Sequence, residues 1–209
     1  MKTLKLERNC RALVVVAHPD DETIWMGGTI LKHPSVKWTV FSLCRKSDKD
    51  REPKFRSVCK RLGARTIITD LEDEGRLSLK ESLAPIKRLI NLKLKNKKFD
   101  CLFTHGRNGE YGHERHLGVH KAIFDLIKSK KIKAKKTLFF NYQNHSRKKD
   151  KMTYKKDSDY IVKLSQKELN EKKRIVAKTY GYAWNGIDVG LCTNPEAFKE
   201  IKIQNTDSR

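Results

Sequence analysis

Val14-Val15-Val16-Ala17-His18-Pro19-Asp20-Asp21-Glu22 is the stretch that decides the fold. A run of β-branched apolar residues ends here in a histidine, a proline and three acids. Such a run predicts a buried strand, and the proline ends it because proline has no N–H to donate to a sheet. His18, Asp20 and Asp21 are therefore expected on a loop at the carboxyl end of a strand, where ligands bind in open α/β sheets.

Two interpretations of this loop are open. Imidazole and carboxylate groups this close together suit a divalent metal such as zinc, and a further carboxylate beside the metal can act as general base. Acids that follow a strand also cap the next helix, and Asp21 or Glu22 fits that simpler role.

A second polar cluster, from His105 to His120, contains four of the seven histidines of the chain. It follows another apolar run, Asp100 to Thr104. His113, His116 and His120 are spaced by three and four residues, which places them on one face of a helix. In a sheet with one helix per strand, the ends of the first and fourth strands are neighbours at the switch point, so the two clusters are expected to share one crevice.

A catalytic zinc takes three protein ligands and leaves one position open. His18, Asp21 and one of His113 or His116 would make that set. The other histidine would then be free to polarise a carbonyl group or to donate a proton.

The rest of the chain alternates between predicted strands and helices. This pattern predicts an α/β fold, a Rossmann-like and mostly parallel sheet flanked by helices, as a single domain over 1–209 with a core at about 10–182. Gly27-Gly28 is interpreted as close packing of a helix on the sheet. The expected elements are strands at 12–17, 36–44, 65–71, 100–104 and 137–142, an edge strand at 160–164, helices at 21–32, 55–63, 78–97, 115–129 and 166–180, solvated chain at 128–136, and a loop or flap at 144–158.

Composition sets broader bounds. The chain has 209 residues and a net charge of +22, which indicates either anionic partners or simply a lysine-rich surface. Its five cysteines lack C-x-x-C spacing, and no apolar leader or membrane-spanning run is visible, so a reducing, cytoplasmic location is expected.

Two motifs together resemble the PIG-L/LmbE-like family of zinc-dependent N-deacetylases. They are Ala17-His18-Pro19-Asp20-Asp21-Glu22 and Gly109-Glu110-Tyr111-Gly112-His113-Glu114-Arg115-His116, in the expected order and at the expected distance. The Rossmann-like pattern fits as far as about Tyr142. One departure is visible: family members often have His-Pro-Asp-His or His-Pro-Asn-His where this chain has His-Glu-Arg-His.

The resemblance implies a role for each matching residue. His18, Asp21 and His116 would be the zinc ligands, although another divalent metal also suits this set. Asp20 would be the general base, and His113 would stabilise the oxyanion or protonate the leaving amine.

The resemblance also implies a substrate, an N-acetylated sugar or sugar conjugate of the N-acetylglucosamine type. Arg45, Arg107 and Arg115 are expected near the crevice, where they would bind hydroxyl groups or the phosphate of an anionic conjugate, or would instead be surface or loop-bracing residues. Glu110 would bond a sugar hydroxyl or orient a ligand histidine. Two alternatives are a metal-dependent amidase for a non-sugar substrate and a basic protein that binds nucleic acid or an anionic surface; no nucleic-acid motif supports the second.

Overall fold

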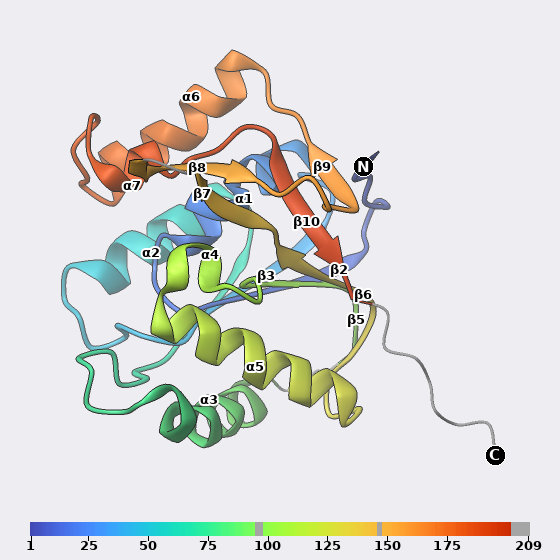
Figure 1. Cartoon of the computed structure of the whole chain (residues 1–209), viewed down its shortest axis with the longest axis vertical. Coiled ribbons are helices and arrows are strands. Elements are labelled where there is room, and N and C mark those ends of the chain that lie inside the picture. Colours follow the sequence, from blue (N-terminus) through green and yellow to red (C-terminus); the bar gives the residue numbers. More distant parts are fainter. Residues whose placement is uncertain (95–97, 146–147, 202–209) are drawn as a thin grey trace.

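The structure is a computed structural model that describes residues 1–94, 98–145 and 148–201. Its centre is an eight-stranded sheet in the order β1-β9-β10-β6-β5-β2-β3-β4 (Figure 1). Five consecutive strands of this sheet are parallel. They are β2 (Arg11–Val16), β3 (Lys37–Ser42), β4 (Arg65–Ile68), β5 (Lys98–Thr104) and β6 (Lys133–Phe140).

The β2 strand is buried on both faces, and this explains its unbroken apolar sequence. Ala12, Val14 and Val16 belong to one hydrophobic core. Leu13 and Val15 alternate with them and belong to the other. A strand at the edge, or one with a solvated face, would need polar residues at every second position.

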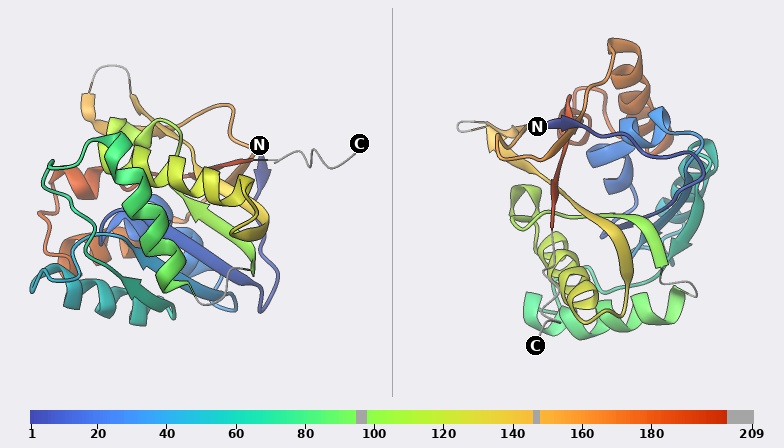
Figure 2. Two further views of the ribbon diagram at one scale, coloured as in Figure 1. Left: turned by 90° about the horizontal axis from the view of Figure 1, so that it is seen from below. Right: turned by 90° about the vertical axis from the view of Figure 1, so that its right-hand side faces the viewer.

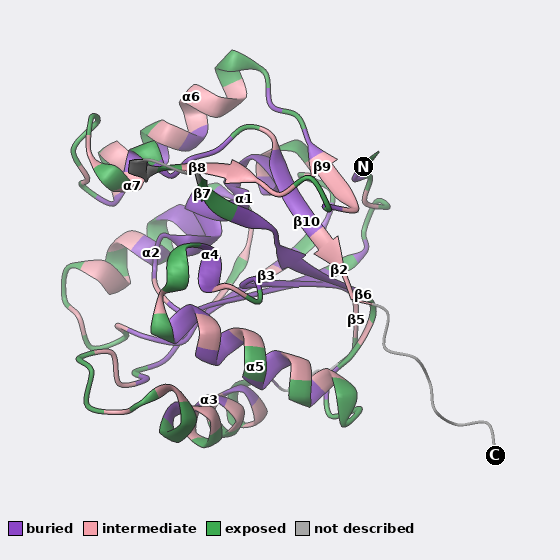
Figure 3. Ribbon diagram, viewed as in Figure 1, coloured by how far each residue is buried: buried purple, intermediate pink, exposed green. Residues whose placement is uncertain are grey.

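Helices form a layer on each face of the sheet (Figure 1 and Figure 2). On one face α1 (Asp21–Lys32), α2 (Arg51–Arg61) and α6 (Gln166–Arg174), continued by a π-helix at Ile175–Thr179, cover the core that contains Val14. On the other face α3 (Leu79–Lys93) and α5 (Glu114–Lys128) pack together over the core that contains Leu13. Figure 3 shows the buried residues gathered in the sheet and on the inner faces of these helices.

The predicted α/β fold with a mostly parallel sheet is therefore confirmed. The chain adds β3 and β4 on one side of β2 and then returns to place β5 and β6 on its other side. Hence β2 and β5 are neighbours at the point where the direction of strand addition reverses, as the sequence predicts.

Two expectations about the last third of the chain are wrong, and one strand there had no sequence signal. The segment 144–158, expected to be a loop or flap, is not an irregular loop, because β7 (Tyr142–His145) and β8 (Lys148–Tyr154) pair as an antiparallel hairpin; residues 146–147 lie outside the described residues. The tail contains β10 (Glu196–Glu200), which pairs antiparallel with β6 and β9. β9 (Tyr160–Val162) is not an edge strand, because the short β1 (Lys2–Thr3) pairs with it.

Smaller differences concern boundaries. β6 begins at Lys133, within the stretch expected to be solvated chain. α3 ends at Lys93, and positions 95–97 of the predicted helix lie outside the described residues. All five cysteines are buried free thiols. In the described part of the chain, every helix is too short or too polar to cross a bilayer.

Gly27 and Gly28 lie where α1 kinks, and the packing interpretation of this pair is confirmed. Met26 has non-helical dihedrals, φ −149° and ψ 17°. A Cβ on Gly28 would lie 2.4 Å from the Leu164 side chain. The kink frees two backbone N–H groups, and the carboxylate of Glu196 accepts both: from Gly28 at 2.8 Å and from Thr29 at 2.6 Å.

Lys172 completes this arrangement. Its Nζ lies 2.7 Å from Oε1 of Glu196, and both side chains are 0% exposed. The buried ion pair thus joins α6, β10 and the second half of α1. Removing one member of such a pair leaves an uncompensated charge in a poorly solvated place.

We expect Lys172→Met to lower the free energy of unfolding by about 3 kcal/mol, because it leaves the Glu196 carboxylate buried without its counter-ion. Lys32→Met is the matched control: Lys32 pairs with Glu168, but the two side chains are 36% and 32% exposed, and such pairs contribute at most about 1 kcal/mol. Urea denaturation measures both. Equal losses in the two variants would contradict the role given to the buried pair.

Candidate active site

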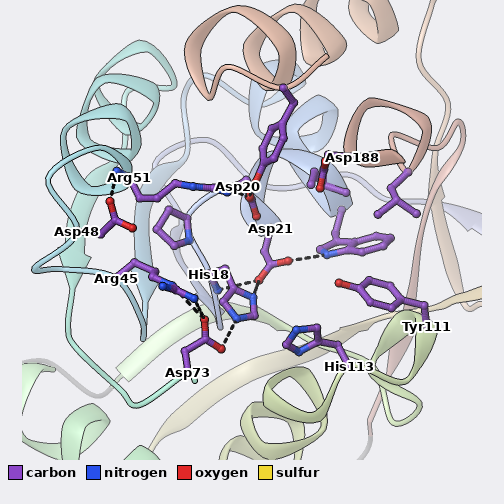
Figure 4. Close-up of a pocket in the computed structure, with 15 residues that line it drawn as sticks. His18, Asp20, Asp21, Arg45, Asp48, Arg51, Asp73, Tyr111, His113 and Asp188 are labelled. Atoms are coloured by element: carbon purple, nitrogen blue, oxygen red, sulfur yellow. Dashed lines mark hydrogen bonds and ion pairs between the residues drawn. The ribbon is translucent and has the colours of Figure 1, made fainter. Parts of the chain in front are cut away.

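A cleft of about 360 Å³ opens at the carboxyl ends of the parallel strands. The loops that follow three strands supply most of its polar lining: His18, Asp20 and Asp21 after β2, Arg45 after β3, and Asp73 after β4. His113 comes from the segment after β5 and is the N-cap of α5. Figure 4 shows these side chains converging on one space. Both sequence clusters therefore meet in one cleft.

Three side chains from the two clusters present nitrogen and oxygen atoms to one point. His18 Nδ1 lies 3.3 Å from Oδ2 of Asp21, and His116 Nε2 lies 3.3 Å from Oδ1 of Asp21. The two imidazole nitrogens are 3.4 Å apart. Ligand atoms held tetrahedrally by zinc at about 2.0–2.1 Å are about 3.3–3.4 Å from one another. The distance between the two imidazole nitrogens matches that of a tetrahedral zinc site, while the two distances to Asp21 end on different carboxylate oxygens, Oδ2 for His18 and Oδ1 for His116.

Metal-ligating atoms also converge within 4.8 Å in three overlapping groups of described residues: His18–His113–His116, His18–Cys44–Asp73 and Asp21–His105–His116. Each includes one poor ligand. Nε2 of His105 accepts a hydrogen bond from the Ala17 N–H at 3.0 Å. Burial, with the nearby charge of Asp73, raises the pKa of the Cys44 thiol far above its usual value. His113 is considered below.

Carboxylates hold both imidazole rings from behind. Nε2 of His18 lies 2.9 Å from Asp73, and Nδ1 of His116 lies 2.7 Å from Oε2 of Glu110. Such contacts fix the tautomer and the orientation of a metal-ligating histidine and increase its basicity. Burial lowers the pKa of both rings and the neighbouring carboxylates raise it, with a net rise for each, so a metal would bind by displacing the proton from the nitrogen that faces Asp21.

Asp21 is itself well supported. It accepts hydrogen bonds from the Trp25 indole N–H at 3.0 Å and from the His18 backbone N–H at 2.8 Å. Burial opposes ionisation, but the adjacent His116 and His105 hold the pKa of Asp21 well below its usual range. Asp21 is therefore ionised at neutral pH.

Asp20 has a different environment. Its backbone is in the left-handed region, with φ 118°, and its N–H donates to Glu22 at 3.1 Å. This turn points the side chain away from the histidines, and its Oδ2 accepts from Arg51 at 2.9 Å and from the hydroxyl of Tyr182. Burial and the charge of Asp21 raise the pKa of Asp20 to about 7. Within the described part of the chain, no donor contacts its Oδ1.

His113 borders the same space as a neutral hydrogen-bond donor. Burial, together with the neighbouring His116 and His18, lowers the pKa of His113 to about 4. Its Nδ1 accepts the Arg115 N–H at 3.2 Å, so the proton of the neutral ring is on Nε2. A metal needs an unprotonated nitrogen, whereas an oxyanion needs this N–H.

The structure does not bring every sequence-predicted residue into the cleft. Arg107 is exposed and does not line it. Glu110 is buried behind His105 and His116, and its Oε1 accepts the Gly106 N–H at 2.7 Å, which favours the orienting role over contact with a sugar. Arg45 lines the cleft and donates two hydrogen bonds to Asp73, at 3.1 Å and 2.8 Å.

The two residues that depart from the family pattern have structural partners. Arg115 is buried and donates to Glu72 at 2.9 Å and to the Leu77 carbonyl at 2.6 Å. Glu114 accepts the Leu79 N–H at 2.7 Å. Both residues connect the start of α5 to the segment that leads into α3.

Sequence analysis assigned no role to Asp73, Arg51 or Tyr182. Asp73 lies in an acidic loop after the third predicted strand, so the rule that ligands gather at carboxyl ends of strands would have found it. Arg51 lies in the charged segment 45–52 after the second predicted strand, which the same rule places near the site, but its contact with Asp20 could not be predicted. Tyr182 carries no local signal, because it meets Asp20 only in the folded chain, across a separation of 162 residues.

Comparison with known proteins identifies the class. A family model described as PIG-L: GlcNAc-PI de-N-acetylase matches residues 13–127, more than half of the chain. The chain belongs to the PIG-L family. The matched segment includes both motifs and ends before Tyr182.

Individual relatives are more distant. Uncharacterized protein L374 of Acanthamoeba polyphaga mimivirus is 26% identical over 130 residues, which cover 54% of this chain and 56% of that protein. The chain thus spans little more than half the length of this relative.

Two solved structures show the same fold. The 4-carboxy-2-hydroxymuconate hydratase GalB of Pseudomonas putida has a TM-score of 0.64 at 14% identity, over 96% of this chain and 99% of its own. The N,N'-diacetylchitobiose deacetylase of Pyrococcus horikoshii has a TM-score of 0.61 at 16% identity, over 91% of this chain and 83% of its own.

We expect Asp73→Asn to weaken zinc binding about tenfold, because a neutral amide orients His18 less firmly and makes its ring less basic. Asp48→Asn is the control. Asp48 also lines the cleft, but among the described residues its carboxylate accepts only the N–H groups of Asp50 and Arg51, which an asparagine oxygen can also do. Competition with a chelator of known affinity measures both. Equal weakening in the two variants would mean that cleft charge, and not the contact with His18, sets the affinity.

Proposed function

We propose that this protein is a zinc-dependent hydrolase that removes the acetyl group from an N-acetylated sugar or sugar conjugate. The observation that carries the proposal is the set of three distances among His18, Asp21 and His116, all between 3.3 Å and 3.4 Å. The description of the family as a GlcNAc-PI de-N-acetylase and the activity of the Pyrococcus horikoshii protein support the reaction class.

The donor set suits the metal. Two imidazole nitrogens and one carboxylate are ligands that zinc accepts readily, so His18, Asp21 and His116 would hold it. Zinc bound there would lower the pKa of a water molecule to about 7 and polarise the amide oxygen. Other divalent metals fit the same ligands, so metal identity is part of the test.

Asp20 is placed to act as general base. Arg51 and Tyr182 both bind Oδ2, so Oδ1 is left to accept a proton from the attacking water. A pKa of about 7 suits this task, since the group is partly ionised at neutral pH and still binds the proton firmly enough to take it.

His113 completes the reaction. Its Nε2–H donates a hydrogen bond to the amide oxygen as negative charge develops on that atom. When the C–N bond breaks, the proton collected by Asp20 passes to the departing nitrogen, and acetate and a free amine are left. Water thus supplies both the oxygen of the acetate and the proton of the amine.

The cleft fits a small polar substrate. Its volume of about 360 Å³ is at the lower end for small-molecule sites. Tyr111, which is 42% exposed, forms an aromatic wall beside His113 (Figure 4). The ring of Trp25 is 6.1 Å from that of Tyr111 and is almost fully buried. A sugar ring has apolar C–H faces that pack on aromatic rings and hydroxyl groups that bond to polar side chains.

We expect acetate to be released from N-acetylglucosamine or a derivative when zinc is present, and Asp20→Asn to reduce turnover by about 10²- to 10⁴-fold without loss of zinc. Asparagine keeps an oxygen for Arg51 and Tyr182 but cannot take a proton. Acetate release and bound metal per chain are measured together.

Three outcomes would contradict the proposal in different ways. Loss of zinc in Asp20→Asn would exchange the roles of Asp20 and Asp21. Zinc binding without acetate release from any sugar would favour a non-sugar amide. Failure to bind any divalent metal would remove the enzyme hypothesis.

We expect Tyr182→Phe to move the acidic limb of the kcat/KM profile to higher pH. The hydroxyl of Tyr182 lowers the pKa of Asp20, so its removal raises that pKa. Because the base must be ionised, activity is lost as the pH falls through the pKa, and the loss then begins at a higher pH. Tyr111→Phe is the control for loss of an aromatic hydroxyl in the cleft, and an equal shift in both variants would contradict the assignment.

A further inference from the structure

The cleft and the groove beside it are rich in carboxylates. The groove, of about 480 Å³, shares Arg45, Asp48 and Asp73 with the cleft. Acidic residues outnumber basic ones in the lining of each, and no lysine lines either among the described residues. This is a local property, because the whole chain has a net charge of +22.

The cations that do line these cavities already have partners. Each guanidinium group is paired with a carboxylate of the protein: Arg45 with Asp73, Arg51 with Asp20, and Arg76 with Glu74. A phosphate group binds best to arginines that are free to form two parallel hydrogen bonds. Away from the proposed metal position, a phosphate would have to compete with an internal carboxylate for these arginines and face the remaining acids.

Asp188 differs from the other acids of the cleft. It lies in α7 (Ile187–Gly190) and lines the cleft. Asp20, Asp21, Asp48 and Asp73 all accept hydrogen bonds from the protein. In the described part of the chain, the Asp188 carboxylate has no hydrogen bond and no ion pair; only its backbone carbonyl accepts, from Cys192.

Asp188 lies where it can contact a bound substrate, away from the residues proposed to carry out the reaction. Figure 4 shows it on the opposite side of the cleft from Arg45 and Asp73. Its charge also contributes to raising the pKa of the Tyr111 hydroxyl, which is raised mainly by burial. Asp188 therefore faces the volume beside the aromatic wall, and it lies outside the segment 13–127 that the family shares.

We propose that Asp188 is a specificity-determining residue that accepts a hydrogen bond from a hydroxyl or ammonium group of the substrate, so that the cleft selects uncharged or cationic N-acetylated sugars over phosphorylated ones. The proposal rests on the proposed function. Asp188, which lacks a partner among the described residues, would bind the substrate, and the acidic lining would disfavour a phosphorylated one.

The test compares N-acetylglucosamine with N-acetylglucosamine 1-phosphate in the zinc-loaded wild type, Asp188→Asn and Asp188→Lys. We expect the wild type to prefer the uncharged sugar. Unit charges several ångströms apart in water change an equilibrium by about threefold. The preference should therefore fall about threefold in Asp188→Asn and about tenfold in Asp188→Lys, mainly through KM, and the effect should weaken at high salt.

Glu7→Gln and Glu7→Lys are matched controls, because they make the same charge changes at an exposed acid that lines neither cavity. They should leave the ratio of the two substrates unchanged. A wild-type preference for the phosphate, or Asp188 variants in which the ratio does not change, would overturn the proposal.

Calorimetric binding of glucosamine and glucosamine 1-phosphate separates this proposal from the proposed function. Absence of acetate release would refute the deacetylase, whereas the binding ratio and its change in the Asp188 variants report on charge selection without any turnover. Tighter binding of glucosamine in the wild type, reduced in Asp188→Lys, is the expected result. Equal binding in all variants would overturn the inference.

Discussion

The site depends on two buried carboxylates that are adjacent in the chain and have opposite environments. Asp21 is held ionised by histidines and an indole N–H, whereas Asp20 is turned through a φ of 118° to Arg51 and Tyr182. Two carboxylates in one environment would compete for a single proton. The strained residue between strand and helix separates them, and under the proposed function this separation would let Asp21 bind a metal while Asp20 carries a proton.

The arrangement of the parallel sheet could be predicted because its determinants are local. The apolar run before His18 can only be a strand with both faces covered, and alternation with helices implies parallel order. β10 was missed because Glu196–Glu200 is polar at its ends and pairs with strands far away in the sequence. The hairpin of β7 and β8 was missed because its residues are polar and basic, so no hydrophobic pattern distinguished it from a loop.

In the candidate site too, the residues with a local sequence signal could be predicted, and the contacts between distant residues could not. The motif residues His18, Asp21 and His116 could be named from the sequence, and the structure brings their ligating atoms together. The supporting contacts could not, because a hydrogen bond between Asp20 and Tyr182 leaves no trace in either neighbourhood. Glu110 shows the intermediate case: the sequence placed it beside the histidines, and burial then decided between its two roles.

The Glu196 carboxylate, which accepts two backbone N–H groups of the kinked helix α1, comes from the last described strand of the chain. The candidate ligands and Arg51 all lie within the first 116 residues, but Tyr182, the second partner of Asp20, and Glu196, which holds the second half of α1, come much later in the chain. During synthesis on a ribosome, a nascent chain therefore contains every candidate metal ligand well before it contains Tyr182. Under the proposed function, a chain that reaches His116 would have all its metal ligands, whereas the proposed base would gain its tyrosine partner only once Tyr182 has been added.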